Sequence, residues 1–253
     1  MTVVGILHPG EMGAAFGAVL RDAGHSVLWV STGRSDATRT RASEAGLEDA
    51  GSLEALASRS DVVLSICPPH AALDLAAALP ELEGVFVDAN AIAPETARRV
   101  GEAVTARGAS FVDGGIVGSP PTRAEPRLFL AGTEAAQVAD LFADTPVQPR
   151  LLAGAPSDAS AVKCAYAAWT KGSSALLLAT RGFARAEGIE AALLEEWAAS
   201  QPDLERSSES AERSAATKGW RWTGEMKEIA SAFEAHGLPR GFHDAAADVY
   251  RKR

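Results

Sequence analysis

Short apolar segments alternate with alanine-rich helical stretches from residue 2 to about residue 152, and this alternation restricts the fold more than any other feature. The apolar segments are almost uninterrupted, which is typical of parallel strands covered by helices on both faces. The expected strands are Val3–Leu7, Val27–Val30, Val62–Ile66, Val85–Asp88, Ser110–Asp113 and Leu128–Ala131. The expected helices are Glu11–Ala23, Asp36–Ala45, Leu53–Ala57, Ala71–Leu79, Pro94–Arg107 and Ala135–Phe142. This order predicts a doubly wound α/β domain over residues 1–155.

The pattern changes after residues 154–156, which read Gly-Ala-Pro. Ser157 or Asp158 can cap a helix that runs without proline to about Glu187. Breaks in the helical pattern that follows are expected at Gly188, Gln201-Pro202, Gly219 and Gly237-Leu238-Pro239. Residues 156–253 are therefore predicted to form one long helix and a small all-helical domain.

Composition excludes several classes of function. No apolar run approaches the ~20 residues of a transmembrane helix, and the segment MTVVGIL lacks the features of a signal peptide. A net charge of −9 without a long basic stretch argues against a nucleic-acid partner. Cys67 and Cys164 lie far apart and form no metal-binding motif, so neither a zinc site nor a disulfide framework is expected. A reducing cytoplasm fits this cysteine usage better.

The first strand leads into a turn and a helix through the segment GILHPGEMG, residues 5–13. Backbone N–H groups at such a helix N-terminus can hold a phosphate, which predicts a Rossmann-type pyrophosphate loop. Its candidate cofactor contacts are His8, Pro9, Gly10, Glu11, Met12 and Gly13. His8 replaces the first glycine of the GxGxxG pattern, and it either contacts the phosphates or is a partly buried turn residue. The alternative for the whole segment is an ordinary strand–turn–helix with small residues for packing.

The segment after the second expected strand bears on the choice between NAD and NADP. An acidic residue there would bind the ribose 2′-hydroxyl, but this chain has Ser31, Thr32 and Arg34, with no acid before Asp36. Hydroxyl groups and a guanidinium suit a 2′-phosphate. NADP is therefore the favoured cofactor and NAD the second choice, and the alternative for Arg34 is a solvated surface arginine.

Five segments in order resemble the β-hydroxyacid dehydrogenase and 6-phosphogluconate dehydrogenase superfamily: GILHPGEMG, ICPPHAALDLA, VDANAIAPETA, FVDGGIVGSPP and the helix that carries Lys163. The last two, with KGWRWTGEMKEIA, resemble a branch with a poorly characterised C-terminal domain, and FVDGGIVGSPP is also similar to the imine reductases. The resemblance implies that Cys67, Pro68 and Pro69 flank the cofactor and that Asn90 approaches the nicotinamide. A helix or turn cap is the alternative for Asn90.

The same resemblance implies that residues 113–120 form a substrate-binding loop, with consecutive glycines that free backbone N–H groups for an anion. The serine that is usual in the family falls on Val117, and Ser119 is a substitute for it. A plain glycine-rich turn is the alternative. The candidate substrate contacts in this loop are Gly115, Ile116, Val117, Gly118 and Ser119.

Lys163 is implied to be the acid/base residue, near the start of the long helix among small or apolar neighbours. Partial desolvation would depress the pKa of its ammonium, which would then protonate a carbonyl oxygen as hydride arrives. In the dehydrogenases an asparagine follows this lysine after four residues, whereas this chain has Ala167. Tyr166 or Thr170, on about the same face, would supply the missing hydrogen bond. A solvated surface lysine is the alternative.

Glu225 lies where many relatives have a lysine–aspartate pair near the cofactor, so it is a candidate substrate contact or an ordinary surface glutamate. These features together predict a dehydrogenase or reductase that transfers hydride between NADP(H) and a small polar substrate of the hydroxyacid or carbonyl type. An imine reductase and a non-catalytic sensor of nicotinamide redox state are the alternatives. Relatives complete their pockets from two subunits, so the resemblance also implies a homodimer.

Overall fold

The computed structural model describes residues 1–252, so only Arg253 of the second expected domain lies outside it. Contacts divide the chain into two compact units, Met1–Lys163 and the residues from Cys164 onward. The first unit contains every strand of the described chain, and the second is helical.

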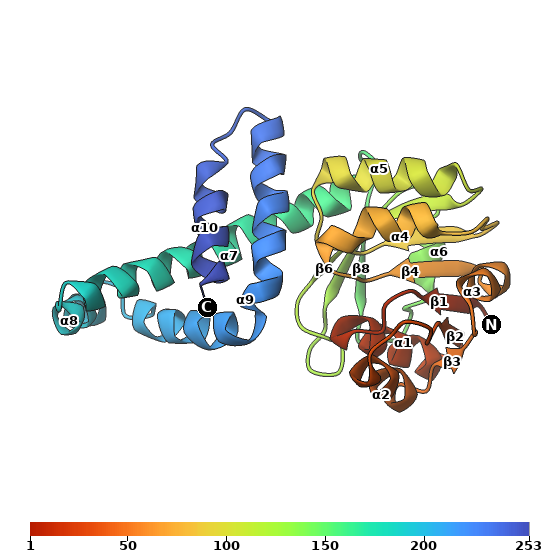
Figure 1. Cartoon of the computed structure of the whole chain (residues 1–253), viewed down its shortest axis with the longest axis horizontal. Coiled ribbons are helices and arrows are strands. Elements are labelled where there is room, and N and C mark those ends of the chain that lie inside the picture. Colours follow the sequence, from red (N-terminus) through yellow and green to blue (C-terminus); the bar gives the residue numbers. More distant parts are fainter. Residues whose placement is uncertain (253) are drawn as a thin grey trace. The chain divides into compact units, whose positions relative to one another are not determined.

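The first unit is built on one sheet of eight strands in the order β3-β2-β1-β4-β5-β6-β7-β8 (Figure 1). The strands are β1 Val3–Ile6, β2 Ser26–Trp29, β3 Glu48–Asp49, β4 Val62–Ser65, β5 Val85–Asp88, β6 Ser110–Val117, β7 Arg127–Ala131 and β8 Gln148–Leu152. All neighbouring strands are parallel except β6 and β7. The prediction of a Rossmann-type α/β fold is confirmed.

Helices cover both faces of this sheet, with α4 and α5 on one face and α1 and α2 on the other (Figure 1). The helices are α1 Glu11–Asp22, α2 Asp36–Glu44, α3 Leu53–Arg59, the 3-10 turn η1 Pro69–Ala71, α4 Ala72–Ala78, α5 Pro94–Thr105 and α6 Ala135–Asp140. Successive strand residues alternate between two buried clusters: Val85 and Val87 belong to one, and Phe86 belongs to the other. This alternation is why the strands read as continuous apolar runs.

The interpretation of residues 114–117 as a glycine-rich loop with free N–H groups is wrong. These residues continue β6 and pair with β7, so that Gly114 faces Leu130 and Gly115 faces Phe129. A Cβ atom on Gly114 would lie 2.8 Å from the carbonyl oxygen of Asp88. The glycines therefore mark a close approach of neighbouring backbone inside a strand, and the loop begins only at Gly118.

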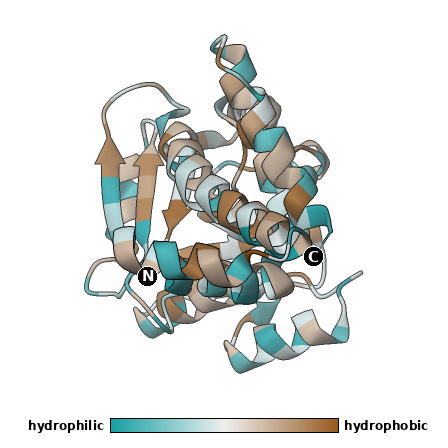
Figure 2. Cartoon of the chain, turned by 90° about the vertical axis from the view of Figure 1, so that its left-hand side faces the viewer, coloured by the Kyte–Doolittle hydropathy of each residue, from teal (hydrophilic) through white to brown (hydrophobic). Residues whose placement is uncertain are grey.

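The second unit consists of long helices: α7 Asp158–Ala186, which begins in the first unit, then α8 Glu190–Ser200, α9 Leu204–Ala235 and α10 Gly241–Arg251. The expected break at Gly219 is wrong, because α9 continues through it and is bent along its length (Figure 1). A helix tolerates an interior glycine at a cost of about 1 kcal/mol, and glycine is a common site of bending. Apolar and polar residues are mixed along the helices in Figure 2, and no helix within residues 1–252 is long and apolar enough to cross a membrane.

Candidate functional site

The loops after β1, β2, β4 and β5 lie at the carboxyl edge of the sheet, where ligands bind in doubly wound folds. The strand order reverses between β1 and β4, and in folds of this kind the ligand crevice lies at such a reversal, which here is beside the β1–α1 loop. Gly10 precedes the first turn of α1, and no protein atom lies within 4 Å of where its Cβ would be. A Cβ on Gly13, in contrast, would lie 2.1 Å from the carbonyl oxygen of His8. Gly13 is therefore required by the turn itself, whereas Gly10 leaves the helix N-terminus open to a ligand.

Arg34 lies against this loop, although 26 residues separate it from His8. Its Nη1 is 3.1 Å from both ring nitrogens of His8, and its Nη2 donates to the carbonyl oxygen of Leu7 at 3.1 Å. Burial, and then the charge of Arg34, lower the pKa of His8 to about 4. At neutral pH the His8 ring is therefore uncharged, and the guanidinium of Arg34 carries the positive charge of this pair.

The sequence analysis missed two further arginines, Arg39 and Arg41, which lie on α2. Arg41 donates from Nη2 to the hydroxyl of Thr38 at 3.2 Å and from Nε to the carbonyl oxygen of Pro9 at 3.5 Å. Arg39 donates from Nε to the carbonyl oxygen of Arg34 at 3.3 Å. The basic residues recur over residues 34–41 in the sequence, but only the fold brings Arg41 to the β1–α1 loop.

Ser31 and Thr32 lie beside β3. The backbone N–H of Ser31 donates to Asp49 Oδ1 at 3.2 Å, and the hydroxyl of Thr32 donates to the carbonyl oxygen of Gly51 at 3.3 Å. Hydrogen bonds from Ser31 and Gly51 lower the pKa of Asp49. This carboxylate lies beside the segment after β2, and the sequence analysis did not anticipate an acid there because β3 is only two exposed polar residues long.

The carboxyl ends of β4 and β5 are joined through the side chain of Asn90, which is almost fully buried. Its Oδ1 accepts from the N–H of Cys67 at 2.5 Å, and its Nδ2 donates to Asp88 at 2.7 Å and to Ser65 at 3.1 Å. Burial raises the pKa of Asp88 to about 7 and that of the Cys67 thiol to about 12. The side chain of Asn90 therefore links the loops after β4 and β5 through hydrogen bonds. Cys67 stays a thiol at neutral pH. Pro68 precedes η1, which begins at Pro69.

The other predicted loop residues lie around this crevice or along β6. Glu11 forms an ion pair with Arg123 at 3.2 Å, and Met12 packs partly buried on the core. Ile116 and Val117 are buried in β6, whereas the following residues, Gly118 and Ser119, are exposed.

Lys163 is held against β6. Its Nζ donates to the carbonyl oxygen of Ile116 at 2.7 Å. A Cβ on Gly115 would lie 3.2 Å from the Cβ of Lys163, so the lysine side chain starts in close contact with the strand. One turn earlier on α7, the N–H and the hydroxyl of Ser160 donate to the carboxylate of Asp113 at 2.7 and 2.6 Å. Burial raises the pKa of Asp113 to about 6, although these hydrogen bonds oppose the rise.

In the second unit, Glu225 is buried in an ion pair with Lys171, 2.5 Å from Oε2 to Nζ. Arg221 Nε lies 3.7 Å from the other carboxylate oxygen. The hydroxyl of Tyr250 on α10 donates to the backbone oxygen of Lys171 at 2.6 Å. Lys171 on α7 therefore contacts both α9, through Glu225, and α10. Glu225 is thus internal to the helical unit. Tyr166, in contrast, is half exposed on α7.

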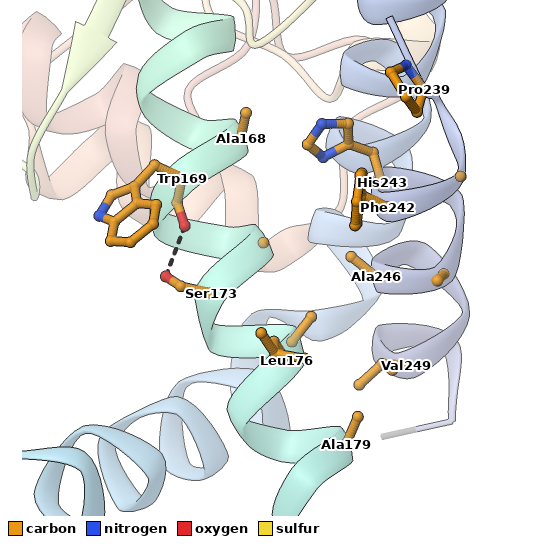
Figure 3. A pocket seen from close by; sticks show the side chains of 14 residues that line it. Ala168, Trp169, Ser173, Leu176, Ala179, Pro239, Phe242, His243, Ala246 and Val249 are labelled. Carbon is orange, nitrogen blue, oxygen red and sulfur yellow. Dashed lines mark hydrogen bonds between the residues drawn. The ribbon is translucent and has the colours of Figure 1, made fainter. Parts of the chain in front are cut away.

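An apolar groove of about 740 Å³ lies between α7 and α10 (Figure 3). Three of its large side chains are mostly exposed, namely Trp169, Leu176 and Phe242. His243 projects into the groove from α10, and its Nδ1 is buried without a hydrogen-bond partner. Burial lowers the pKa of this histidine, so the groove presents an uncharged surface at neutral pH.

The sheet order and the loops at its carboxyl edge define a protein of the Rossmann dinucleotide-binding class. Residues 2–143 match the NAD-binding domain of 6-phosphogluconate dehydrogenase, and residues 184–252 match a domain of unknown function, DUF1932. The first match covers more than half of the chain, which therefore belongs to the family of this NAD-binding domain. The resemblance drawn from the sequence motifs is confirmed. No curated protein matches the chain significantly.

Several solved structures are similar over nearly the whole chain. The conserved protein MTH1747, of unknown function and similar to 3-hydroxyacid dehydrogenases, is 28% identical with a TM-score of 0.72, over 99% of this chain and 96% of that chain. The 3-hydroxyisobutyrate dehydrogenase of Mycobacterium tuberculosis with L-serine is 21% identical with a TM-score of 0.73, over 100% and 93%. The reductive aminase from Aspergillus terreus with NADPH4, cyclohexanone and allyl amine is 19% identical with a TM-score of 0.64, over 99% and 93%.

These likenesses show a hydroxyacid-dehydrogenase-like fold with an NAD-binding domain. Within residues 1–252, no cluster of three or more His, Cys, Asp or Glu side chains is arranged to hold a metal ion.

Proposed function

We propose that this protein is an NADP(H)-dependent oxidoreductase that acts on the CH–OH or carbonyl group of a small polar substrate. Lys163 is the proposed proton donor and acceptor. Its ammonium donates to the carbonyl oxygen of Ile116, so it is held at the strand instead of being fully solvated, and this observation carries the proposal. The nicotinamide cofactor supplies or accepts the hydride.

The residues of the crevice suit a dinucleotide. Open space at Gly10 and the free N-terminus of α1 fit a pyrophosphate. Arg34 and Arg41, both against the same loop, fit the added negative charge of a 2′-phosphate. Asn90 and the segment from Cys67 to Pro69 would border the nicotinamide half, with Asn90 acting through the loops that it joins.

In the reductive direction, a hydride adds to the carbonyl carbon and Lys163 gives a proton from Nζ to the carbonyl oxygen, which forms the alcohol. The neutral amine then regains a proton from solvent. In the oxidative direction the amine takes the hydroxyl proton while hydride leaves the carbon. Gly115 to Ser119, at the end of β6 and the start of the loop after it, are the proposed substrate contacts.

The cofactor preference is tested by fluorescence titration of the protein with NADPH and NADH. Arg34→Ala is expected to weaken NADPH binding about 10- to 100-fold, because a charge-assisted contact to a phosphate contributes about 1.5–3 kcal/mol. NADH binding should change less than threefold. Thr2→Ala, outside the crevice, serves as the control. Equal loss of both nucleotides would contradict a role in 2′-phosphate recognition and favour NAD.

Lys163→Met is expected to lower the rate of carbonyl reduction about 10²- to 10⁴-fold, because a positioned proton donor contributes that factor. NADPH oxidation with a panel of short 2- and 3-oxo acids measures the rate, and Lys227→Met is a control on an exposed lysine. NADPH affinity should stay unchanged in both variants. A substitution that leaves oxo-acid reduction intact would remove Lys163 from the mechanism.

A second candidate function is imine reduction, favoured by Val117 in place of the family serine and by Ala167 in place of the asparagine. Reduction of a cyclic imine that survives Lys163→Met would support it. The third candidate, a sensor that binds NADP(H) without turnover, is excluded by turnover of any substrate in these panels.

We also propose that the protein is a homodimer in the cytoplasm. The groove between α7 and α10 is apolar, and its exposed Trp169 and Phe242 suit a second copy of the same surface. Both cysteines are free, which fits a reducing compartment. Sedimentation equilibrium at micromolar concentration is expected to give twice the monomer mass, and a monomer mass would contradict the dimer.

A further inference from the structure

A buried pair of side chains ties β6 to the first turn of α7. Asp113 on β6 and Ser160 on α7 are both fully buried. One carboxylate oxygen accepts from the Ser160 hydroxyl at 2.6 Å, and the other accepts from the Ser160 N–H at 2.7 Å. The first N–H groups of a helix have no partner inside the helix, and this carboxylate accepts a hydrogen bond from one of them in the first turn of α7.

Lys163 follows Ser160 by three residues and lies on about the same face of α7. Its Nζ reaches the carbonyl oxygen of Ile116, three residues beyond Asp113 on the same strand. Between these two contacts, a Cβ on Gly115 would lie 2.5 Å from the backbone oxygen of Ala159. The strand and the first turn of the helix are therefore in direct backbone contact, with one polar anchor on each side of it.

We infer that Asp113 and Ser160 are positioning residues for Lys163. They fix the rotation and the height of the first turn of α7 against β6, and thereby hold the ammonium at the carbonyl oxygen of Ile116. This inference rests on the proposed role of Lys163 in proton transfer. A displacement of about 1 Å at a reacting group can cost about 10²-fold in rate, so a small shift of this turn has a measurable effect.

A purely structural role is the competing explanation, and the chain offers a matched control. Ser60 is also buried in the first unit, and its hydroxyl donates to a single oxygen, that of Leu56, at 2.7 Å. Ser60→Ala and Ser160→Ala therefore each remove one buried hydroxyl that donates to one oxygen, a backbone carbonyl in the first case and a carboxylate in the second. Only Ser160 lies next to the lysine.

The test is the pH profile of acetylation of Lys163 by acetic anhydride, read by mass spectrometry with Lys227 as internal reference. Ser160→Ala is expected to raise labelling of Lys163 at least threefold and to shift its pH profile, whereas Ser60→Ala leaves both unchanged. Asp113→Asn combined with Ser160→Ala should label no more than the stronger single variant, because both act through one contact. Equal labelling in the Ser60 and Ser160 variants, or additive effects in the pair, would overturn the inference.

Kinetics separate this inference from the proposed function. With an oxo acid that the wild-type protein reduces, Ser160→Ala is expected to lower kcat about tenfold with little change in KM, and to have no further effect when added to Lys163→Met. If Lys163→Met leaves kcat intact, the proposed function fails, while the labelling result still decides the positioning. If Lys163→Met lowers kcat and Ser160→Ala does not, only the positioning role fails.

Discussion

Gly13→Ala is expected to destabilise the first unit strongly and to remove dinucleotide binding, whereas Gly10→Ala should affect binding alone. The new Cβ at residue 13 would lie 2.1 Å from the carbonyl oxygen of His8, which is backbone and cannot rotate away. The turn must therefore open, and we expect a loss at the upper end of the roughly 1–3 kcal/mol that overpacking costs. Urea unfolding and NADPH titration measure the two effects.

Gly10→Ala is the matched control, because its Cβ meets no protein atom within 4 Å and its φ of −68° suits any residue. The free energy of unfolding should stay within about 0.5 kcal/mol of wild type. Nucleotide affinity should still fall about tenfold or more, since the methyl group would occupy the place of the pyrophosphate. Wild-type affinity in the Gly10 variant would show that the phosphate does not lie at this turn.

Glu225→Gln is expected to cost about 3–5 kcal/mol in the free energy of unfolding of the helical unit. The carboxylate is buried between Lys171 and Arg221, so its loss leaves two neighbouring cations without their common partner. Lys171→Met should cost less, because Arg221, whose Nε has no hydrogen-bond partner, can still approach the acid. Urea unfolding followed by tryptophan fluorescence measures both variants.

The pair between Lys227 and Asp244 is the control, since Lys227 is exposed, and Lys227→Met should leave the free energy of unfolding nearly unchanged. The double variant Lys171→Met, Glu225→Met should recover much of the loss, because well-packed apolar residues can replace a buried ion pair. A Glu225→Gln variant as stable as the wild type would mean that the ion pair is not buried in solution.

The elements that the sequence predicted correctly are those whose pattern is local. The apolar runs of β1, β4 and β5, the turn glycines and the Ser-capped start of α2 all carry their signal within a few residues. β3 and β8 were missed because their stability comes from neighbours: β3 is two exposed acidic residues, and β8 contains Pro149, which an edge strand can tolerate. The glycines of β6 were interpreted as a loop because consecutive glycines are typical of loops. Here they are needed inside a strand, where neighbouring backbone approaches closely.

For the candidate site, too, the features with a local pattern could be predicted from the sequence and the long-range contacts could not. The sequence alone determined the Rossmann-type fold, the family and the segments from which the crevice is built, because strand and helix periodicity and the spacing of glycines are local properties. Only the tertiary structure decided which residues meet: Arg41 with the β1–α1 loop, Asp113 with Ser160, and Lys171 with Glu225. The residues in these contacts are 32 to 54 positions apart in the sequence. Which of them meet depends on how whole helices and strands pack, and a short stretch of sequence does not determine that packing.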